Sequence, residues 1–472
     1  MRKDGIADMK KIKCIVSLLL IVLLTACGNN GNTGSETAEQ QVSFGNTALE
    51  NPAEQMPSEE VTEQQVSSGN TALDTAAQQV SSGTNDLIHS HKKEHKYIHN
   101  EEGYYNLLED GTEFELTGQI SGTCWICASS CAMSTAYQKK HEGSIVFDQM
   151  ALLNEIYDED KDEGVFVTEG VDKGKIGGLA IFVMNELNQG FGDGLVLDGA
   201  ISVKGWSSDQ IREGIKKYGA LYIGIPDSDS SKQGEHDGYF TMNTPDPKES
   251  EFDHSIAVIG WDDHFPKEYF RVEASGDGAW ITYNSSYPLG YYYVSYDTPF
   301  DQKNDIPMFL SVTDRYKKVL SHDCGLWVTD PLITGDVTVT ASVFKGKGTL
   351  SAVGTYSLKD DQELTISILS SDLSECLYSQ KSHIDRTGYH VIELEEPQEV
   401  DEYAISVSYP GGAPVEGESM DLTNTERLKV TSDRGQSFVL IDGKWLDMSE
   451  KPTWDSCGMV TNNACIKALY TE

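Results

Sequence analysis

The chain has 472 residues and a formal net charge of −39, from 36 basic and 75 acidic side chains. This excess of negative charge disfavours nucleic acid and anionic lipid as electrostatic partners, so we predict that the protein does not bind nucleic acid. The length suffices for two globular domains, each with its own hydrophobic core.

The first 26 residues have the features of a bacterial export signal. Basic side chains crowd residues 1–13, and residues 15–24 are apolar apart from Ser17, a run too short to span a bilayer as a helix. The segment ends in Leu24-Thr-Ala-Cys27, which resembles the lipobox of bacterial lipoproteins. The resemblance implies that residues 1–26 are removed and that Cys27 carries a lipid anchor on the outer face of the cell membrane. An ordinary secretory signal, in which Cys27 has no role, is the alternative.

Residues 27–100 are predicted to be a disordered linker. They are rich in Ser, Thr, Gly, Asn, Gln and Glu, and a Gln-Gln-Val-Ser motif recurs at unequal intervals. A solenoid needs a fixed repeat length and an apolar face that neighbouring repeats can bury. This segment has neither, and so few apolar groups cannot offset the entropy lost on ordering.

Four histidines lie near the end of this linker, and they have two interpretations. Histidines at this density bind Zn or Cu opportunistically. A solvated polar segment is the interpretation that we favour, because a flexible chain lacks the fixed surroundings that orient ligand histidines. We therefore predict no metal site and no cofactor. The four residues are His89, His91, His95 and His99.

Cys124 is the first candidate catalytic residue. It begins a segment of helical character, residues 124–140. At a helix N-terminus, backbone N–H groups and the helix dipole favour the nucleophilic thiolate. Cys127 and Cys131 share its helix face, which leaves three interpretations: small buried residues, a redox pair of Cys124 and Cys127, or a metal or iron–sulfur site. We favour the first, and an odd number of cysteines after export also suits one free thiol.

Two later segments supply an imidazole and an amide. His254 precedes a strand-like run, residues 255–260, and Asn284 ends another, residues 279–283. An imidazole can take the proton of a thiol, and a third group can orient the imidazole. The order Cys, His, Asn, with the last two about 130–150 residues after the cysteine, is typical of papain-type enzymes. A purely structural histidine is the competing interpretation.

The chain resembles the papain family of cysteine peptidases, and in particular a bacterial branch with a C-terminal lectin-like domain. The resemblance covers residues 101–318 for the peptidase and 319–472 for the second module. It implies an α+β papain-like catalytic domain, a protein or peptide substrate, and a Cys-His-Asn triad that forms a thioester acyl-enzyme. It is carried by Gly122-Thr-Cys-Trp125, by His254 with Ala257-Val-Ile-Gly-Trp-Asp-Asp263, and by Gly278-Ala-Trp-Ile281 before Asn284.

The resemblance assigns further roles and also shows two departures. It implies that Gln119 donates to the oxyanion and that Gly177 and Gly178 accept the substrate backbone as an added strand. A plain helix-start turn is the alternative for the two glycines. Gln119 lies five residues before the nucleophile where the family usually has six. The Trp that normally follows the Asn-Ser pair is absent, and Tyr287 is a candidate replacement.

The second module is predicted to be an all-β sandwich, because strand-like runs recur between turns. The resemblance implies a lectin-like domain and suggests a glycan partner. A stabilising or substrate-positioning β domain is the alternative. The runs are residues 337–341, 350–356, 363–369, 403–407 and 437–441.

Together these features predict a surface-anchored bacterial cysteine endopeptidase that uses Cys124, His254 and Asn284. Two alternatives stay open. One is a catalytically weak papain-like protein that acts in adhesion or carbohydrate binding. The other is a thiol–disulfide oxidoreductase built on Cys124 and Cys127, which would give His254 and Asn284 no role.

Overall fold

The computed structural model describes most of the chain after residue 101. The described residues are 102–115, 117–190, 194–227, 233–248, 251–286, 288–303, 305–324, 333–417, 420–422, 425–450 and 463–472. The predicted export signal, lipid-bearing Cys27, linker and histidine group lie outside these residues. Within the described residues, no helix combines the length and apolar character needed to cross a membrane.

Helix α2 (Cys124–Lys140) is the central element of the N-terminal module, which is predicted to span residues 101–318. It confirms the helix predicted for these residues. Small Ala, Ser and Cys side chains along its buried part allow close packing, and two lysines in its last turn complement the helix dipole. The other α-helices of the described chain are α3 (Gln149–Ile156), α4 (Ala180–Leu187) and α5 (Ser208–Tyr218).

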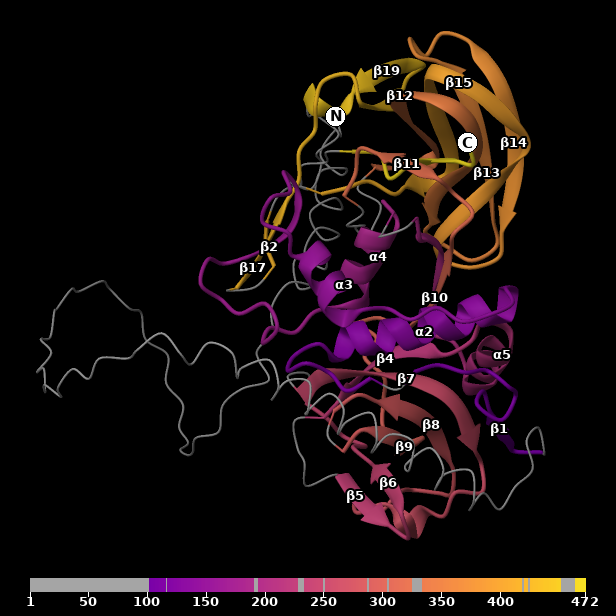
Figure 1. Cartoon of the computed structure of the whole chain (residues 1–472). Helices are drawn as coiled ribbons and strands as arrows, with labels where there is room; N and C mark the ends of the chain where they lie inside the picture. The colour runs from indigo at the N-terminus through magenta and orange to yellow at the C-terminus, as the bar shows by residue number, and fades with distance from the viewer. Residues whose placement is uncertain are drawn as a thin grey trace, which may run out of the picture. The chain divides into compact units, whose positions relative to one another are not determined.

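The N-terminal module also contains a largely antiparallel sheet. Its central strand, β7 (Phe252–Asp262), pairs with β1 (Tyr104–Asn106), β4 (Leu221–Pro226) and β8 (Ala279–Asn284). Helix α2 lies between this sheet and the pair α3 and α4 (Figure 1). Further elements are β3 (Val196–Ser202), β5 (Gln233–His236), β6 (Tyr239–Met242), β9 (Gly290–Ser295), β10 (Met308–Thr313) and the 3-10 helix η4 (Lys267–Tyr269).

The register of β7 and β8 brings the predicted imidazole and amide to one end of the sheet. Ala257 pairs with Tyr283, so Asn284 is level with Ile256. Side chains alternate between the two faces of a strand, and therefore His254 and Asn284 point to the same face. Both strands are rich in β-branched and aromatic residues and almost wholly buried, which fixes this register.

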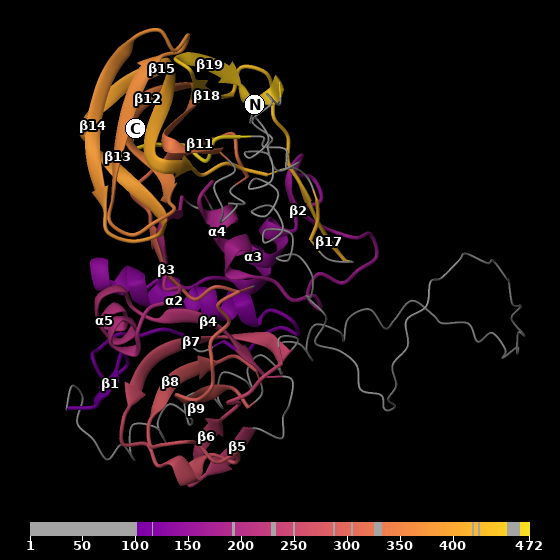
Figure 2. The ribbon, with the colours of Figure 1, turned by 180° about the vertical axis from the view of Figure 1, so that it is seen from behind.

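The C-terminal module is a lectin-like β domain. Its long strands curve around a shared apolar interior that includes Phe344, Leu364 and Ile405 (Figure 1, Figure 2). The elements are β11 (Lys318–Ser321), β12 (Ile333–Ser357), β13 (Gln362–Ser370), β14 (Cys376–Ile384), β15 (Gly388–Ala413), β16 (Met420–Asp421), β17 (Glu426–Lys429), β18 (Ser437–Ile441), β19 (Lys444–Asp447), η5 (Met448–Glu450) and β20 (Lys467–Tyr470).

One detail of the predicted strands is corrected. The runs 337–341 and 350–356 were predicted as separate strands, but both belong to β12, which pairs with β15 along most of its length. Irregularities in the pairing after Lys345 and after Leu350 bend β12 without ending it. A bulge of this kind turns a strand while its hydrogen-bond ladder continues. The strand-like pattern of the sequence is therefore interrupted although the strand itself is continuous.

The two modules share strand pairing. Strand β2 (Gly164–Val167) of the N-terminal module pairs with β17, and β3 pairs with the start of β15. Thr168 N donates to Thr425 O at 2.8 Å, which extends the β2–β17 ladder. These hydrogen bonds join residues far apart in sequence, and they fasten the segment after α3 to the C-terminal module.

Candidate active site

Cys124 is the first residue of α2, as predicted, and the residue is 7% exposed. The preceding Thr123 does not cap the helix with its side chain. Its hydroxyl instead accepts from Ile120 N at 2.9 Å and donates to Gln149 at 3.0 Å. The sulfur therefore belongs to the first turn of α2, where the partial positive charge of the helix N-terminus is strongest.

The structure brings His254 and Asn284 into direct contact. His254 Nε2 lies 2.9 Å from Asn284 Oδ1, and both side chains are buried. The hydroxyl and backbone N–H of Ser286 also donate to Asn284 Oδ1, at 2.8 and 3.0 Å. Because the two Ser286 groups donate to this atom, it is the oxygen of the Asn284 amide and not its nitrogen. An oxygen can only accept, so Nε2 of His254 carries a proton and donates it. The other ring nitrogen, Nδ1, is then the one available to a thiol.

The charge balance at His254 favours the imidazolium. Burial lowers its pKa, but the charge of Cys124 and a side-chain hydrogen bond with that residue raise it, as do the charge of Asp227 and the hydrogen bond to Asn284. The net effect raises the pKa of His254 to about 10. A protonated imidazole beside a thiolate is the resting state that a cysteine nucleophile requires.

Asp227 is a residue of the site that the sequence did not reveal. It follows β4 directly, and its Oδ2 lies 4.0 Å from His254 Nε2. Burial raises the pKa of Asp227, while the charge of His254 and a hydrogen bond from Gln233 lower it. The sequence does show an acidic residue directly after a strand-like apolar run. It does not show that this strand pairs with the strand that carries His254, because strand pairing is decided by the assembled sheet.

Gln119 lies beside the end of β8, close to the residue that follows Asn284. Its backbone N–H donates to Ser285 O at 2.9 Å, and the Ser285 hydroxyl donates to Gln119 Oε1 at 3.1 Å. The Gln119 amide group donates to Ser121 O at 2.5 Å. Ser121 has a φ of 58°, a left-handed conformation that tightens the loop before the nucleophile. The role of Gln119 as oxyanion donor stays a prediction.

Gly177 and Gly178 lie next to residues 122–125, the nucleophile segment that carries Cys124. A Cβ on Gly178 would approach the indole of Trp125, the residue after Cys124, to 2.3 Å, so packing alone requires glycine there. A Cβ on Gly177 would meet nothing within 4 Å, which leaves its backbone approachable. Gly122 N donates to Gly174 O at 2.8 Å and ties the two segments together. Substrate binding by this pair stays a prediction.

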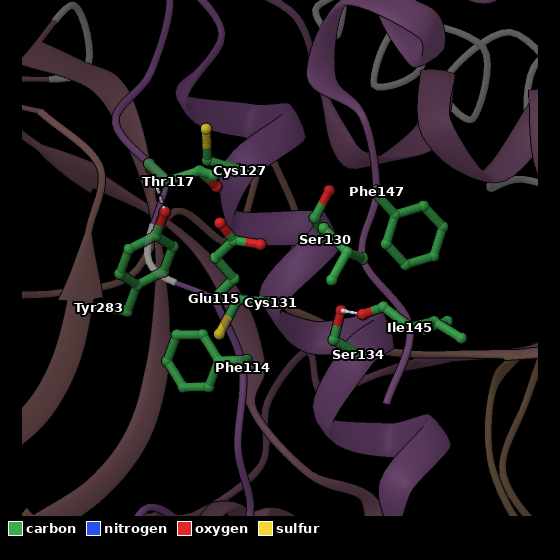
Figure 3. Close-up of a pocket in the computed structure, with 11 residues that line it drawn as sticks. Phe114, Glu115, Thr117, Cys127, Ser130, Cys131, Ser134, Ile145, Phe147 and Tyr283 are labelled. Atoms are coloured by element: carbon green, nitrogen blue, oxygen red, sulfur yellow. Dashed lines mark hydrogen bonds between the residues drawn. The ribbon is translucent and has the colours of Figure 1, made fainter. Parts of the chain in front are cut away.

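Cys127 and Cys131 are buried free thiols on the same helix. Burial raises the pKa of Cys127 to about 12 and that of Cys131 well above its usual range. Both line a small cavity of about 20 Å³, together with Phe114, Ser130 and Tyr283 (Figure 3). This surrounding favours the protonated thiol, as expected of small interior residues. Among the described residues, no three His, Cys, Asp or Glu side chains cluster closely enough to hold a metal ion.

Asn284 is buried to 1% exposure although the usual tryptophan is missing. The side chain of Ser286 contacts its amide oxygen directly. Tyr287, the predicted replacement for the tryptophan, lies outside the described residues. The contact between His254 and Asn284 is therefore kept from water, since both residues are buried.

The architecture is that of a papain-like α+β domain followed by a lectin-like β domain. A family model described as "Lectin like domain" matches residues 321–471. A clostridial cysteine protease, Cwp84 after propeptide cleavage, superposes with a TM-score of 0.62 and 15% sequence identity, over 78% of this chain and 99% of that one.

A second solved structure comprises the cysteine protease and lectin-like domains of Cwp84, a surface-layer-associated protein of Clostridium difficile. It gives a TM-score of 0.60 at 15% identity and covers 80% of this chain and 90% of that one. At this level of identity the likeness shows the fold alone. A comparison with curated protein sequences finds no match.

Proposed function

We propose that this protein is a cysteine endopeptidase that hydrolyses peptide bonds with Cys124, His254 and Asn284. The observation that carries the proposal is the 2.9 Å contact from His254 Nε2 to Asn284 Oδ1, which leaves Nδ1 free for the thiol at the start of α2. A redox pair or a metal site built on the cysteines of α2 has no use for that contact. The triad function explains all three residues together.

The proposed reaction has two halves. The Cys124 thiolate attacks the carbonyl carbon of the substrate, the C–N bond breaks, and His254 gives its proton to the departing amine. Water then attacks the thioester, His254 takes a proton from that water, and the C–S bond breaks to restore the thiolate. The N–H of Cys124 and the amide of Gln119 stabilise the oxyanion in both halves.

An epoxide thiol probe of the kind that attacks papain-type enzymes tests this proposal. We expect the adduct to map to Cys124 by mass spectrometry and peptide cleavage to be lost in Cys124→Ala. Cys131→Ser is the matched control, because this thiol lies on the same helix and burial raises its pKa well above the usual range. Full peptidase activity in Cys124→Ala would refute the proposal. Disulfide reductase activity that Cys124→Ala and Cys127→Ser both abolish would support the redox alternative.

We further propose that the enzyme is held at the outer face of the cell membrane by a lipid on Cys27. The lipobox motif Leu24-Thr-Ala-Cys27 supports this, and a surface location also agrees with that of Cwp84, a surface-layer-associated protein. Its substrates would then be proteins or peptides outside the cell. Cys27→Ala should release the protein into the medium, and continued partition of this variant into detergent would point to another anchor.

A second candidate function is glycan binding by the C-terminal module, supported by the family match over residues 321–471. The full chain carrying Cys124→Ala allows binding to be measured without proteolysis. Retention on cell-wall polysaccharide that a soluble glycan competes away would support it. No retention, with normal peptide cleavage by the parent enzyme, would leave the module with a structural role.

A further inference from the structure

We propose that Asp227 is a positioning residue for His254, whose carboxylate faces the imidazole beside Asn284 and stabilises the imidazolium. This inference rests on the proposed peptidase function of Cys124. It adds an anionic partner to a triad whose third member, Asn284, is neutral.

The carboxylate is turned toward the imidazole by its other contacts. Asp227 Oδ2 lies 4.0 Å from His254 Nε2, the same nitrogen that donates to Asn284. The other carboxylate oxygen, Oδ1, accepts a hydrogen bond from the amide of Gln233. Because Gln233 holds one oxygen, rotation of the carboxylate is restricted and the second oxygen stays directed at His254.

The backbone of Asp227 is tied to the residues just before His254. Its N–H donates to Asp253 Oδ1 at 3.0 Å and to Glu251 O at 3.2 Å. The register of β4 and β7 shifts between Ile225, which pairs with His254, and Pro226. The strand irregularity therefore re-aims the chain so that Asp227 reaches the imidazole, a common use of bulges beside active sites.

The groups that act on His254 come from three directions. Cys124 approaches from the start of α2, Asn284 from the end of β8, and Asp227 from the end of β4. The Asp227 side chain is only 15% exposed, so water screens this interaction less than it would a surface pair. A carboxylate at this distance favours the charged imidazole.

The interaction between Asp227 and His254 contributes at two stages of the proposed reaction. In the resting enzyme it stabilises the imidazolium that accompanies the Cys124 thiolate. In the second half it strengthens His254 as the base that takes a proton from the attacking water, after the thiolate charge has been consumed in the thioester. At that point the charge of Asp227 still acts on His254.

The first test is the pH profile of kcat/KM for a peptide substrate. In Asp227→Asn we expect the alkaline limb, which reports loss of the imidazolium, to move down by about one pH unit or more. We expect kcat to fall several-fold in Asp227→Asn with KM little changed. Asp227→Glu should recover part of the alkaline limb and part of kcat. Asp246→Asn removes one exposed carboxylate and controls for net charge. An alkaline limb that Asp227→Asn leaves in place would overturn the proposal.

The second test does not depend on peptidase activity. The His254 imidazole is titrated by NMR in Cys124→Ala and in Cys124→Ala with Asp227→Asn, with His254→Ala used to assign the signal. We expect a pKa lower by about one unit in the double variant. Identical titration curves would refute the role of Asp227 even if the enzyme is active. A shifted curve, together with a parent enzyme that cleaves no peptide, would instead refute the proposed function while supporting the role of Asp227.

Discussion

The hydroxyl of Tyr157, in the N-terminal module, donates a 2.6 Å hydrogen bond to Glu426 Oε1 in β17 of the C-terminal module. Both side chains are buried. The same hydroxyl lies 3.4 Å from Gly177 O, and the Tyr157 ring packs edge-on against Trp125, the neighbour of the nucleophile. The lectin-like module thus contacts the tyrosine that supports both the glycine pair and the nucleophile segment.

Breaking this contact should weaken both the fold and substrate binding. A buried polar group left without its hydrogen-bond partner costs about 1–3 kcal/mol, so Tyr157→Phe should lower the free energy of unfolding by about that amount. We expect KM to rise more than kcat falls, because Gly177 rather than the triad loses support. Denaturant unfolding and steady-state kinetics measure the two effects. Glu402→Gln, which removes an exposed carboxylate of the same module, should change neither.

Removal of the amide that orients His254 should reduce turnover strongly. Asn284→Ala removes the acceptor of the Nε2 hydrogen bond, and that bond contributes to the raised pKa of His254. We expect kcat to fall by about 10- to 100-fold, as for a lost hydrogen bond to a charged group. The pKa of His254 should fall as well, which narrows the active pH range on the alkaline side.

Ser286→Ala supplies the comparison for this variant, since its hydroxyl donates to the same amide oxygen but does not touch His254. Its effect on kcat should be smaller than that of Asn284→Ala. Equal activity of Asn284→Ala and the parent enzyme would show that the imidazole is oriented by other groups.

Gly177 and Gly178 form a matched pair for testing substrate binding. Gly178→Ala would place a Cβ 2.3 Å from Trp125, so we expect it to destabilise the fold by about 1–3 kcal/mol, as overpacking does. Gly177→Ala meets no neighbour within 4 Å and should leave the free energy of unfolding nearly unchanged. If the substrate backbone lies against Gly177, this variant raises KM. An unchanged KM would favour the simple helix-start turn.

The raised pKa of Asp305 leads to a prediction of how the free energy of unfolding depends on pH. It is buried, and its Oδ2 accepts from Tyr222 at 2.5 Å and from Ser255 at 3.2 Å. Burial is the largest effect and raises the pKa of Asp305 to about 7 from 3.8. The folded state therefore holds a proton that the unfolded state has released, and the stability from this group is lost as pH rises from about 4 through about 7.

Asp305→Asn should remove that pH dependence, because the amide does not titrate. Relative to the parent, the variant should become more stable as pH rises over this interval, by about 1.4 kcal/mol for each unit of pKa difference. Denaturant midpoints measured at pH 5 and pH 8 give the comparison. A difference between variant and parent that is the same at both values would contradict the raised pKa.

Local pattern was enough to predict much of this protein. The α2 helix from Cys124 to Lys140 and the strands that carry His254 and Asn284 follow from runs of small, apolar and β-branched residues. The resemblance to papain-type enzymes predicted the α+β fold and the lectin-like module, and both are confirmed. These features depend on residues close together in sequence, or on a motif that keeps its order.

Other features were decided only when distant segments came together. The approach of Asp227 to His254 depends on which strand pairs with β7, and the bond from Tyr157 to Glu426 joins two modules. Likewise, β12 is one strand because pairing with β15 continues through its bends. The sequence by itself determined the chemical groups and the local elements that carry them. Sheet register and packing between modules depend on contacts across the whole chain, so only the tertiary structure decided which groups meet.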